Sequence, residues 1–340
     1  MSKTTILIFL VIILFAGFIL SLCLGSVLLS PSQIIDALFS GKSSIYSDII
    51  IEYRLPKAIT AVIAGMALSI SGLLMQNFFR NPLAGPFVLG VSSGAGLFVA
   101  ILIMTGWYAG LSLGSIDIHQ STMVSFAAII GAMAVLLLLL LIQSINKDYT
   151  TLLIVGLMIS SAVSAVISLI QYFSQSQDIQ RYLLWTMGSL GALSWWEISG
   201  LVIALLVCVT VLIVIIKPLN ALNLGESYAL SMGVKVQTVR ILILLTSGVL
   251  AGMITAYCGP IGFIGLAVPH LSRQFLKTFH PAWLIPGTAI TGGAILLFCD
   301  IIAQVPGMDF VLPINTVTAL FGAPWVIIYL LRKKLSGTFN

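Results

Sequence analysis

The chain alternates between long apolar runs and short polar connections. Nine runs approach or exceed the roughly 20 residues that an α-helix needs to cross the ~30 Å hydrocarbon core of a bilayer. A tenth stretch, residues 261–271, is apolar but short, and Pro269 interrupts it. The nine runs are residues 6–29, 58–76, 87–106, 121–143, 151–172, 197–216, 240–257, 283–303 and 312–331. This pattern predicts a bundle of membrane-spanning helices.

The distribution of Lys and Arg indicates whether the tenth stretch crosses. With ten crossings, both termini are cytoplasmic, and eleven of the 15 basic residues lie inside. The four left outside are Lys42, Arg54, Lys57 and Arg181. With nine crossings, the last five cations move outside, and the split becomes six inside to nine outside. Because cytoplasmic loops carry the excess of basic residues, we expect an all-α polytopic membrane protein with ten spans and both termini cytoplasmic.

Composition supports this fold class. Hydrophobic residues make up 59% of the 340 residues and charged residues only 7%, whereas soluble domains carry about 25% charged residues. This excludes a soluble enzyme, a disordered chain and a nucleic-acid-binding protein. No connection is long enough for a soluble domain, so residues 1–340 are interpreted as one membrane domain. The four cysteines form no CxxC pair and the three histidines are scattered, so no metal site is expected.

The spans offer few groups that could drive transport or catalysis. Asp300 and His270 are the main ionisable residues within them. An ion-driven transporter usually keeps a set of carboxylates or histidines at mid-membrane, and this chain has no clear set of that kind. The energy source is therefore expected to lie outside this chain. The chain is not expected to hydrolyse ATP itself, because the P-loop-like Gly41-Lys42-Ser43 lacks its leading glycine. Two alternatives stay open: a secondary transporter, and an intramembrane protease using Ser92 or Ser93 with His270.

The inner connection, residues 217–239, is the most informative loop. Pro218 is expected to end the preceding span, and two short helices are expected to follow outside the membrane. The partly apolar face of this segment is formed by Leu219, Leu222, Leu224, Tyr228 and Leu230. An exposed apolar face suggests either a docking partner or a helix that rests on lipid headgroups.

On the outer side, Arg54 and Lys57 place two cations at the mouth of the second span. They are either ordinary flanking charges or exposed cations that meet acidic groups on a delivery partner, which would set orientation and association rate.

Several ordered blocks, spread over about residues 50–331, carry a resemblance. They are Arg54-Leu-Pro-Lys57, Arg80-Asn-Pro-Leu-Ala84, Leu89-Gly-Val-Ser-Ser-Gly-Ala95, Gly262-Phe-Ile-Gly-Leu266 with Pro269-His270, and Leu312-Pro313 with Thr318-Ala-Leu-Phe-Gly-Ala-Pro324. In these blocks the chain resembles the FecCD-type permeases. Members of that family are the membrane subunits of ATP-binding-cassette importers for ferric siderophores, haem and cobalamin.

The resemblance implies the type II importer fold with ten helices, in the cytoplasmic membrane of a bacterium. It implies a homodimer, embedded in lipid, whose substrate path is lined by the fifth and tenth spans and switches by alternating access. Two partner ATPases would bind ATP and Mg²⁺, so that this chain holds no cofactor and no catalytic residue. They would dock on Leu219, Leu222, Leu224, Gly225 and Glu226.

The resemblance also implies an extracytoplasmic binding protein that docks at Arg54, Lys57 and Gln304, and a cytoplasmic gate at Asn81, Tyr149 and Thr150. Two residues depart from the family pattern. Gln304 stands where the family has an arginine, and Tyr149 is bulkier than the usual small polar residue. Within the family's substrate range, a ferric siderophore is the first expectation, followed by haem and a corrinoid.

Overall fold

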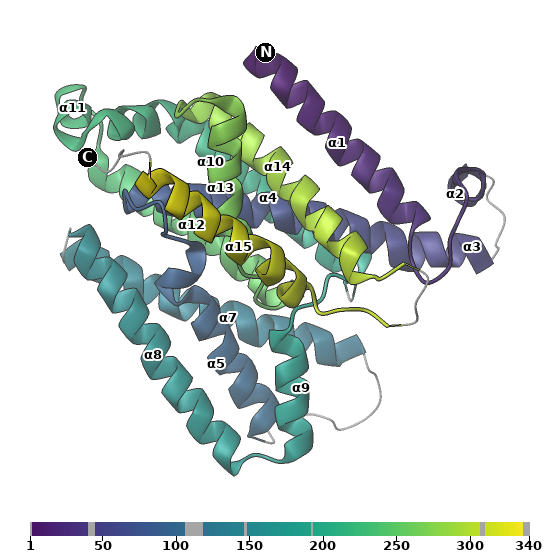
Figure 1. Ribbon diagram of the computed structural model, residues 1–340. Coiled ribbons are helices and arrows are strands. Elements are labelled where there is room, and N and C mark those ends of the chain that lie inside the picture. Colours follow the sequence, from purple (N-terminus) through teal and green to yellow (C-terminus); the bar gives the residue numbers. More distant parts are fainter. Residues whose placement is uncertain are drawn as a thin grey trace.

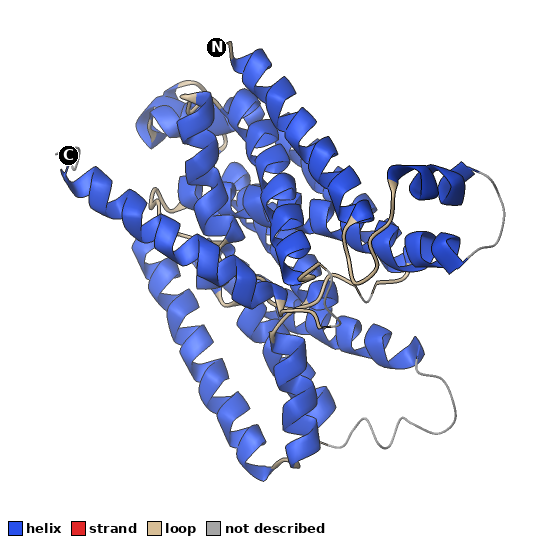
Figure 2. Cartoon of the chain, turned by 45° about the vertical axis from the view of Figure 1, so that its right-hand side comes forward, coloured by secondary structure: helices blue, strands red, loops and turns tan. Residues whose placement is uncertain are grey.

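The computed structural model describes residues 2–39, 45–105, 118–145, 148–191, 193–306 and 310–335, and every regular element in these residues is a helix (Figures 1 and 2). Seven helical segments among them are long and apolar enough to cross a membrane. They are α1 (Lys3–Cys23), Ile45–Phe78, Thr122–Ile145 within α7 (Ile118–Ile145), α8 (Tyr149–Phe173), α10 (Trp195–Leu224), α12 (Val236–Cys258) and α14 (Pro281–Ala303). The prediction of a multi-pass helical protein is confirmed.

Three further helices fall on the remaining apolar runs: α5 (Val91–Met104), α13 (Ile264–Leu276) and α15 (Ile314–Leu335). They are shorter or less apolar than the seven, so the expectation of ten crossings stays a prediction. The small connecting helices are α2 (Pro31–Phe39), α3 (Ile45–Asp48), the π-helical turn η1 (Ile49–Arg54), the 3-10 turn η2 (Pro86–Leu89), α9 (Ser176–Thr186) and α11 (Glu226–Ser231).

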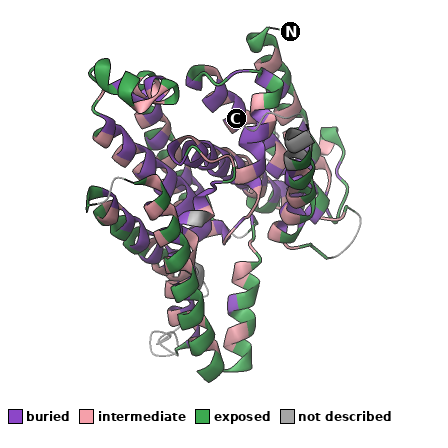
Figure 3. Ribbon diagram, turned by 60° about the vertical axis from the view of Figure 1, so that its left-hand side comes forward, coloured by how far each residue is buried: buried purple, intermediate pink, exposed green. Residues whose placement is uncertain are grey.

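The centre of the bundle is α4 (Leu55–Phe78), which packs against α12, α13 and α14. Glycines bring these backbones close together. A methyl group added at Gly72 would overlap the carbonyl of Gly265 on α13, and one added at Gly65 would overlap the carbonyl of Gly292 on α14. Small residues allow such close approach of helices. Figure 3 shows the resulting buried centre with more exposed helices around it.

Helix α8 lies at the edge of the bundle (Figure 1). Only 6% of its most apolar stretch is buried, against 83% for the segment that contains α4. Its exposed side carries Ser161, Ser164 and Ser168, which are three and four residues apart and therefore share one face. Helix α8 thus presents an unpartnered face that is partly polar.

Hydrogen bonds group the charged residues at two ends of the bundle. At one, the α11 end, Lys3 donates to Thr278 and Arg240 contacts both α8 and α11. At the other, the α9 end, Arg181 pairs with Asp178 within α9, and Lys57 pairs with Asp300. These two groups agree with the inner and outer sets of basic residues that the distribution of Lys and Arg predicts. Which end faces the cytoplasm stays a prediction.

Candidate functional site

The corner between α10 and α11 holds the residues expected to bind an ATPase. Helix α10 continues through Pro218 to Leu224, so the expectation that Pro218 ends the span is wrong. The physical reason is that the helix beyond the proline stays packed: Leu219 is 1% exposed and belongs to the main core. Packing here outweighs the loss of one helical hydrogen bond, which proline imposes.

The five predicted docking residues differ in how far they are exposed to a partner. Leu219 is buried and Leu222 is half-buried against the core, so Leu219 is not available to a docked partner. Leu224 is exposed, and Gly225 and Glu226 follow it at the turn into α11. Tyr228 and Leu230 in α11 and Met232 directly after it are exposed as well. These four exposed apolar side chains, Leu224, Tyr228, Leu230 and Met232, are called the α11 patch below.

Gly225 shapes this corner, because its φ of 134° and ψ of 150° lie in a region that is essentially closed to other residues. An added methyl group would meet no atom within 4 Å, so only backbone strain opposes a side chain. We expect Gly225→Ala to destabilise the corner by about 1–3 kcal/mol and to weaken ATPase association.

Co-purification of the ATPase subunit measures the effect of Gly225→Ala. Gly85→Ala is the matched control, since Gly85 also has open space around it but has an ordinary φ of −116°. Equal ATPase yields from the two variants would contradict the role of backbone strain.

A chain of polar contacts joins α11 to the first residue of α8. Arg240 on α12 donates through Nη2 to Glu226 Oε2 at 2.8 Å and through Nε to the Tyr149 hydroxyl at 2.8 Å. The guanidinium carbon also lies 4.3 Å from the centroid of the Tyr149 ring. The Arg240 side chain is only 5% exposed, whereas that of Glu226 is 39% exposed. A buried cation therefore bridges a predicted docking residue and a predicted gate residue.

The other two predicted gate residues are sequence neighbours of these contacts: Thr150 follows Tyr149, and Asn81 comes three residues after Phe78, the last residue of α4. Asn81 accepts a hydrogen bond from the Leu83 N–H at 2.9 Å, and the Thr150 side chain is exposed. Asp148 caps α8 by accepting from the Thr151 N–H at 2.8 Å and from the Thr151 hydroxyl at 2.7 Å. These bonds hold the pKa of Asp148 below its usual range. The cap is therefore fully formed above the usual carboxyl pKa and weakens as the pH falls through the lowered value.

At the α9 end, the expectation that Arg54 is an exposed cation is wrong. Arg54 is 9% exposed and donates to the carbonyls of Leu22, Cys23 and Val27. These carbonyls belong to the end of α1 and the segment that follows it, where the last turn of a helix leaves acceptors without partners. The side chain therefore caps α1 and does not point into solvent.

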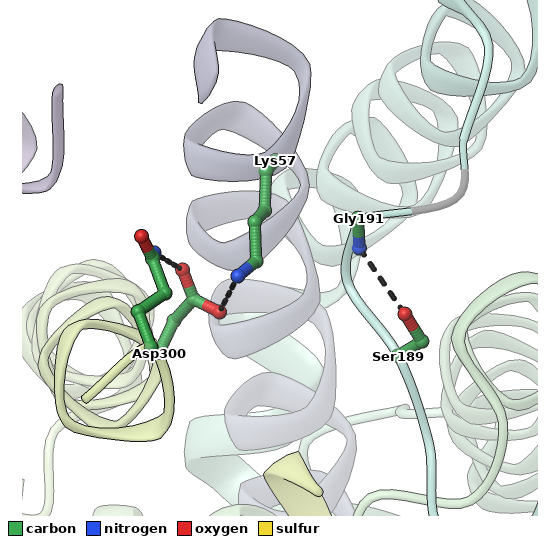
Figure 4. Close-up of polar contacts among 5 residues, drawn as sticks. Lys57, Ser189, Gly191 and Asp300 are labelled. Carbon is green, nitrogen blue, oxygen red and sulfur yellow. Dashed lines mark hydrogen bonds and ion pairs between the residues drawn. The ribbon is translucent and has the colours of Figure 1, made fainter. Parts of the chain in front are cut away.

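Lys57 is also engaged within the chain. Its Nζ lies 3.1 Å from Oδ1 of Asp300, whose side chain is 3% exposed. The second carboxylate oxygen of Asp300 accepts from Gln304 Nε2 at 2.7 Å. Figure 4 shows Lys57 and Asp300 pointing toward one another, with the loop that carries Ser189 and Gly191 on the other side of Lys57. Gln304 thus contributes to a buried ion-pair cluster.

The three predicted docking residues at this end, Arg54, Lys57 and Gln304, line one cavity of about 400 Å³. Tyr53 and Val311 complete part of its wall. The structure therefore brings the three residues together, although two of them are mostly buried. Their docking role stays a prediction.

Of the remaining motifs, Gly41-Lys42-Ser43 lies outside the residues that the structure describes, and Ser92 and His270 have separate hydrogen-bond partners. The Ser92 hydroxyl hydrogen bonds with Thr255 at 3.1 Å, whereas His270 Nε2 bonds to the Pro82 carbonyl at 2.7 Å. Within the described residues, no group of three or more His, Cys, Asp or Glu could hold a metal ion.

Two features were not identified as functional from sequence. Arg240 was only counted as an inner cation; the signal was a single arginine at the start of an apolar run. Asp300 was noted as an ionisable residue, but its pairing with Lys57 depends on the packing of α14 against α4.

Comparisons with known proteins agree on one family. The model described as the FecCD transport family matches residues 12–333. The chain is 36% identical over 318 residues to the vitamin B12 import system permease protein BtuC of Salmonella typhi, covering 93% of this chain and 91% of that protein. It is 36% identical over 284 residues to the hemin transport system permease protein HmuU of Yersinia pestis, covering 83% and 82%.

Solved structures share the fold. One, described as an inward-facing conformation of a metal-chelate type ABC transporter, matches with a TM-score of 0.82 and 30% identity, over 97% of this chain and 99% of that one. PsaBC from Streptococcus pneumoniae, solved in complex with Fab, matches with a TM-score of 0.53 and 14% identity, over 88% and 95%. The second likeness concerns the fold alone.

Proposed function

Because the chain belongs to the FecCD transport family and is the permease of an ABC importer, we propose that two copies of it form the path by which an iron chelate, haem or a corrinoid crosses the cytoplasmic membrane of a bacterium. Ferric siderophore is the first choice of substrate. The relatives named for vitamin B12 and hemin transport support the wider class.

The single observation that supports the dimeric path is the exposed face of α8. Of the seven candidate spans in the described residues, four are less than 40% buried, and α8 has the lowest mean hydropathy of these four, 2.4 against 2.8 to 3.2 for α1, α7 and α10. A face that remains in contact with lipid should be the most apolar, not the least. A face with serines at helical spacing fits the wall of a polar path that a second copy completes.

Two ATPases would dock on the α11 patch, whose exposed apolar side chains precede and follow the half-exposed Glu226 in the chain. The extracytoplasmic binding protein would dock at the α9 end, around the cavity lined by Arg54, Lys57 and Gln304. ATP binding would draw the docking corners together and switch the path by alternating access. This chain would supply the path and the docking surfaces, and the ATPases would supply hydrolysis.

We expect Leu230→Asp combined with Met232→Asp to lower ATPase co-purification at least about tenfold, because central apolar contacts each contribute on the order of 1–2 kcal/mol. Gln177→Asp on α9 is the control, since Gln177 is exposed at the opposite end. Undiminished association of the double variant would contradict docking at the α11 patch.

The function itself is tested with the complete importer, reconstituted in proteoliposomes with its ATPases and binding protein. Labelled ferric siderophores, haemin and cyanocobalamin serve as a panel of probes. The proposal predicts accumulation of one class of probe with MgATP and none with MgADP. Accumulation driven by an ion gradient without ATP would contradict it and favour a secondary transporter.

A further inference from the structure

The buried side chain of Arg240 joins two helices that otherwise have separate neighbours. Helix α11 packs mainly on α10 and α12, whereas α8 packs mainly on α5 and η2. Arg240 contacts both, through Glu226 at the start of α11 and Tyr149 at the start of α8. A movement of α11 therefore has a direct polar route to α8.

The geometry of the guanidinium makes this route stiff. Its donors lie in one plane and point in fixed directions, so Glu226 and Tyr149 are held at a set angle to each other. Both bonds are 2.8 Å long, and Arg240 is nearly excluded from water. A hydrogen bond to a buried charge is costly to break, so the partners should move together rather than separate.

The contacts of Tyr149 extend the route to α4. Its ring meets the ring of Phe78 edge-on, with centroids 5.2 Å apart, and Phe78 is the last residue of α4. The rest of α8 is mostly exposed, so its first turn is one of its firmer attachments. The position of this end of α8 depends on the contacts around Tyr149.

We propose that Arg240 is a positioning residue that transmits displacement of the ATPase-docking helix α11 to the gate end of α8. The inference rests on the proposed function, because it needs ATPases docked at α11 and a path beside α8. It adds a named connection, Glu226 to Arg240 to Tyr149, by which nucleotide binding reaches the gate.

The test follows the gate end of α8 without needing the transported substrate. A cysteine is introduced by Thr150→Cys, where the side chain is exposed, in a chain carrying Cys23→Ser, since the other three cysteines are buried. The reconstituted complex with its ATPases is labelled with a hydrophilic maleimide, with and without MgATP and vanadate. Trapped nucleotide and bound ATPase are measured in the same samples.

We expect nucleotide trapping to change the labelling rate of this cysteine. Tyr149→Phe keeps the ring and removes only the hydroxyl. This variant and Arg240→Gln should each reduce the nucleotide-dependent change in labelling rate about tenfold, because a hydrogen bond to a charged group has about that effect on an equilibrium. Exchanging the charges with Glu226→Arg and Arg240→Glu should restore much of the response, because the Tyr149 hydroxyl can donate to a carboxylate. A purely structural role of Arg240 would instead lower bound ATPase and trapped nucleotide together with the response.

Ser176→Cys, exposed at the α9 end, serves as the control position and should respond equally in all variants. A full response in Tyr149→Phe and Arg240→Gln with nucleotide trapped would overturn the inference and leave the proposed function standing. A complex with the unaltered Arg240 and Tyr149 that bound no ATPase, or did not respond to nucleotide, would instead overturn the proposed function and this inference with it.

Discussion

Gly72→Ala is expected to disrupt the packing of α4 against α13 and to yield little folded protein. The added methyl group would overlap the carbonyl of Gly265, and that carbonyl belongs to a helix backbone that cannot rotate away. Forcing extra atoms into a packed core costs about 1–3 kcal/mol and sometimes more, and here two central helices would have to separate. Thermal unfolding and size-exclusion profiles of the purified protein measure the loss.

Gly200→Ala is the matched control for this substitution. Gly200 lies inside α10, and a methyl group there would meet nothing within 4 Å. Alanine favours a helix by up to about 1 kcal/mol over glycine, so this variant should be unchanged or slightly more stable. If Gly72→Ala were as stable as Gly200→Ala, the close packing of α4 and α13 would be refuted.

Lys57→Met is expected to destabilise the protein by about 3–5 kcal/mol, because it leaves the buried carboxylate of Asp300 without its cation. The single bond from Gln304 does not neutralise that charge. A loss of this size is a large part of the 5–15 kcal/mol that holds a typical protein folded. The change in unfolding temperature in detergent or nanodiscs provides the measurement.

Two further variants isolate the ion pair. Lys57→Met combined with Asp300→Asn removes both charges and should recover most of the stability, since replacing both members of a buried pair is often nearly neutral. Arg181→Met breaks the exposed pair with Asp178, in which the arginine side chain is 61% exposed, and should cost less than about 1 kcal/mol. Equal losses from Lys57→Met and Arg181→Met would contradict the importance of burial.

The helices could be predicted from sequence because their signal is local. A run of some 20 apolar residues must form a helix in lipid, where each backbone polar group needs a partner within the chain. The short helix α13 had no such signal, and the arguments for it were the balance of basic residues and the resemblance. Its place against α4 depends on Gly72 and Gly265, which lie almost 200 positions apart in the sequence.

The resemblance assigned a docking corner, a gate and an outer cluster to particular residues, and these roles stay predictions. The structure does bring Arg54, Lys57 and Gln304 to one cavity. Burial was not predictable, because it depends on distant partners. Arg54 reads as an exposed charge until the carbonyls of Leu22, Cys23 and Val27 are placed around it.

The serine hydroxyl groups on α8 determine which hydrogen bonds this helix can offer to a neighbouring molecule. Ser160, Ser161 and Ser168 each donate their proton to a carbonyl of their own helix, from Gly156, Leu157 and Ser164. Each oxygen then offers lone pairs but no free hydrogen. In the proposed path along α8, these oxygens could accept hydrogen bonds from a solute but could not donate to its anionic groups, so the solute should stay at this face only briefly.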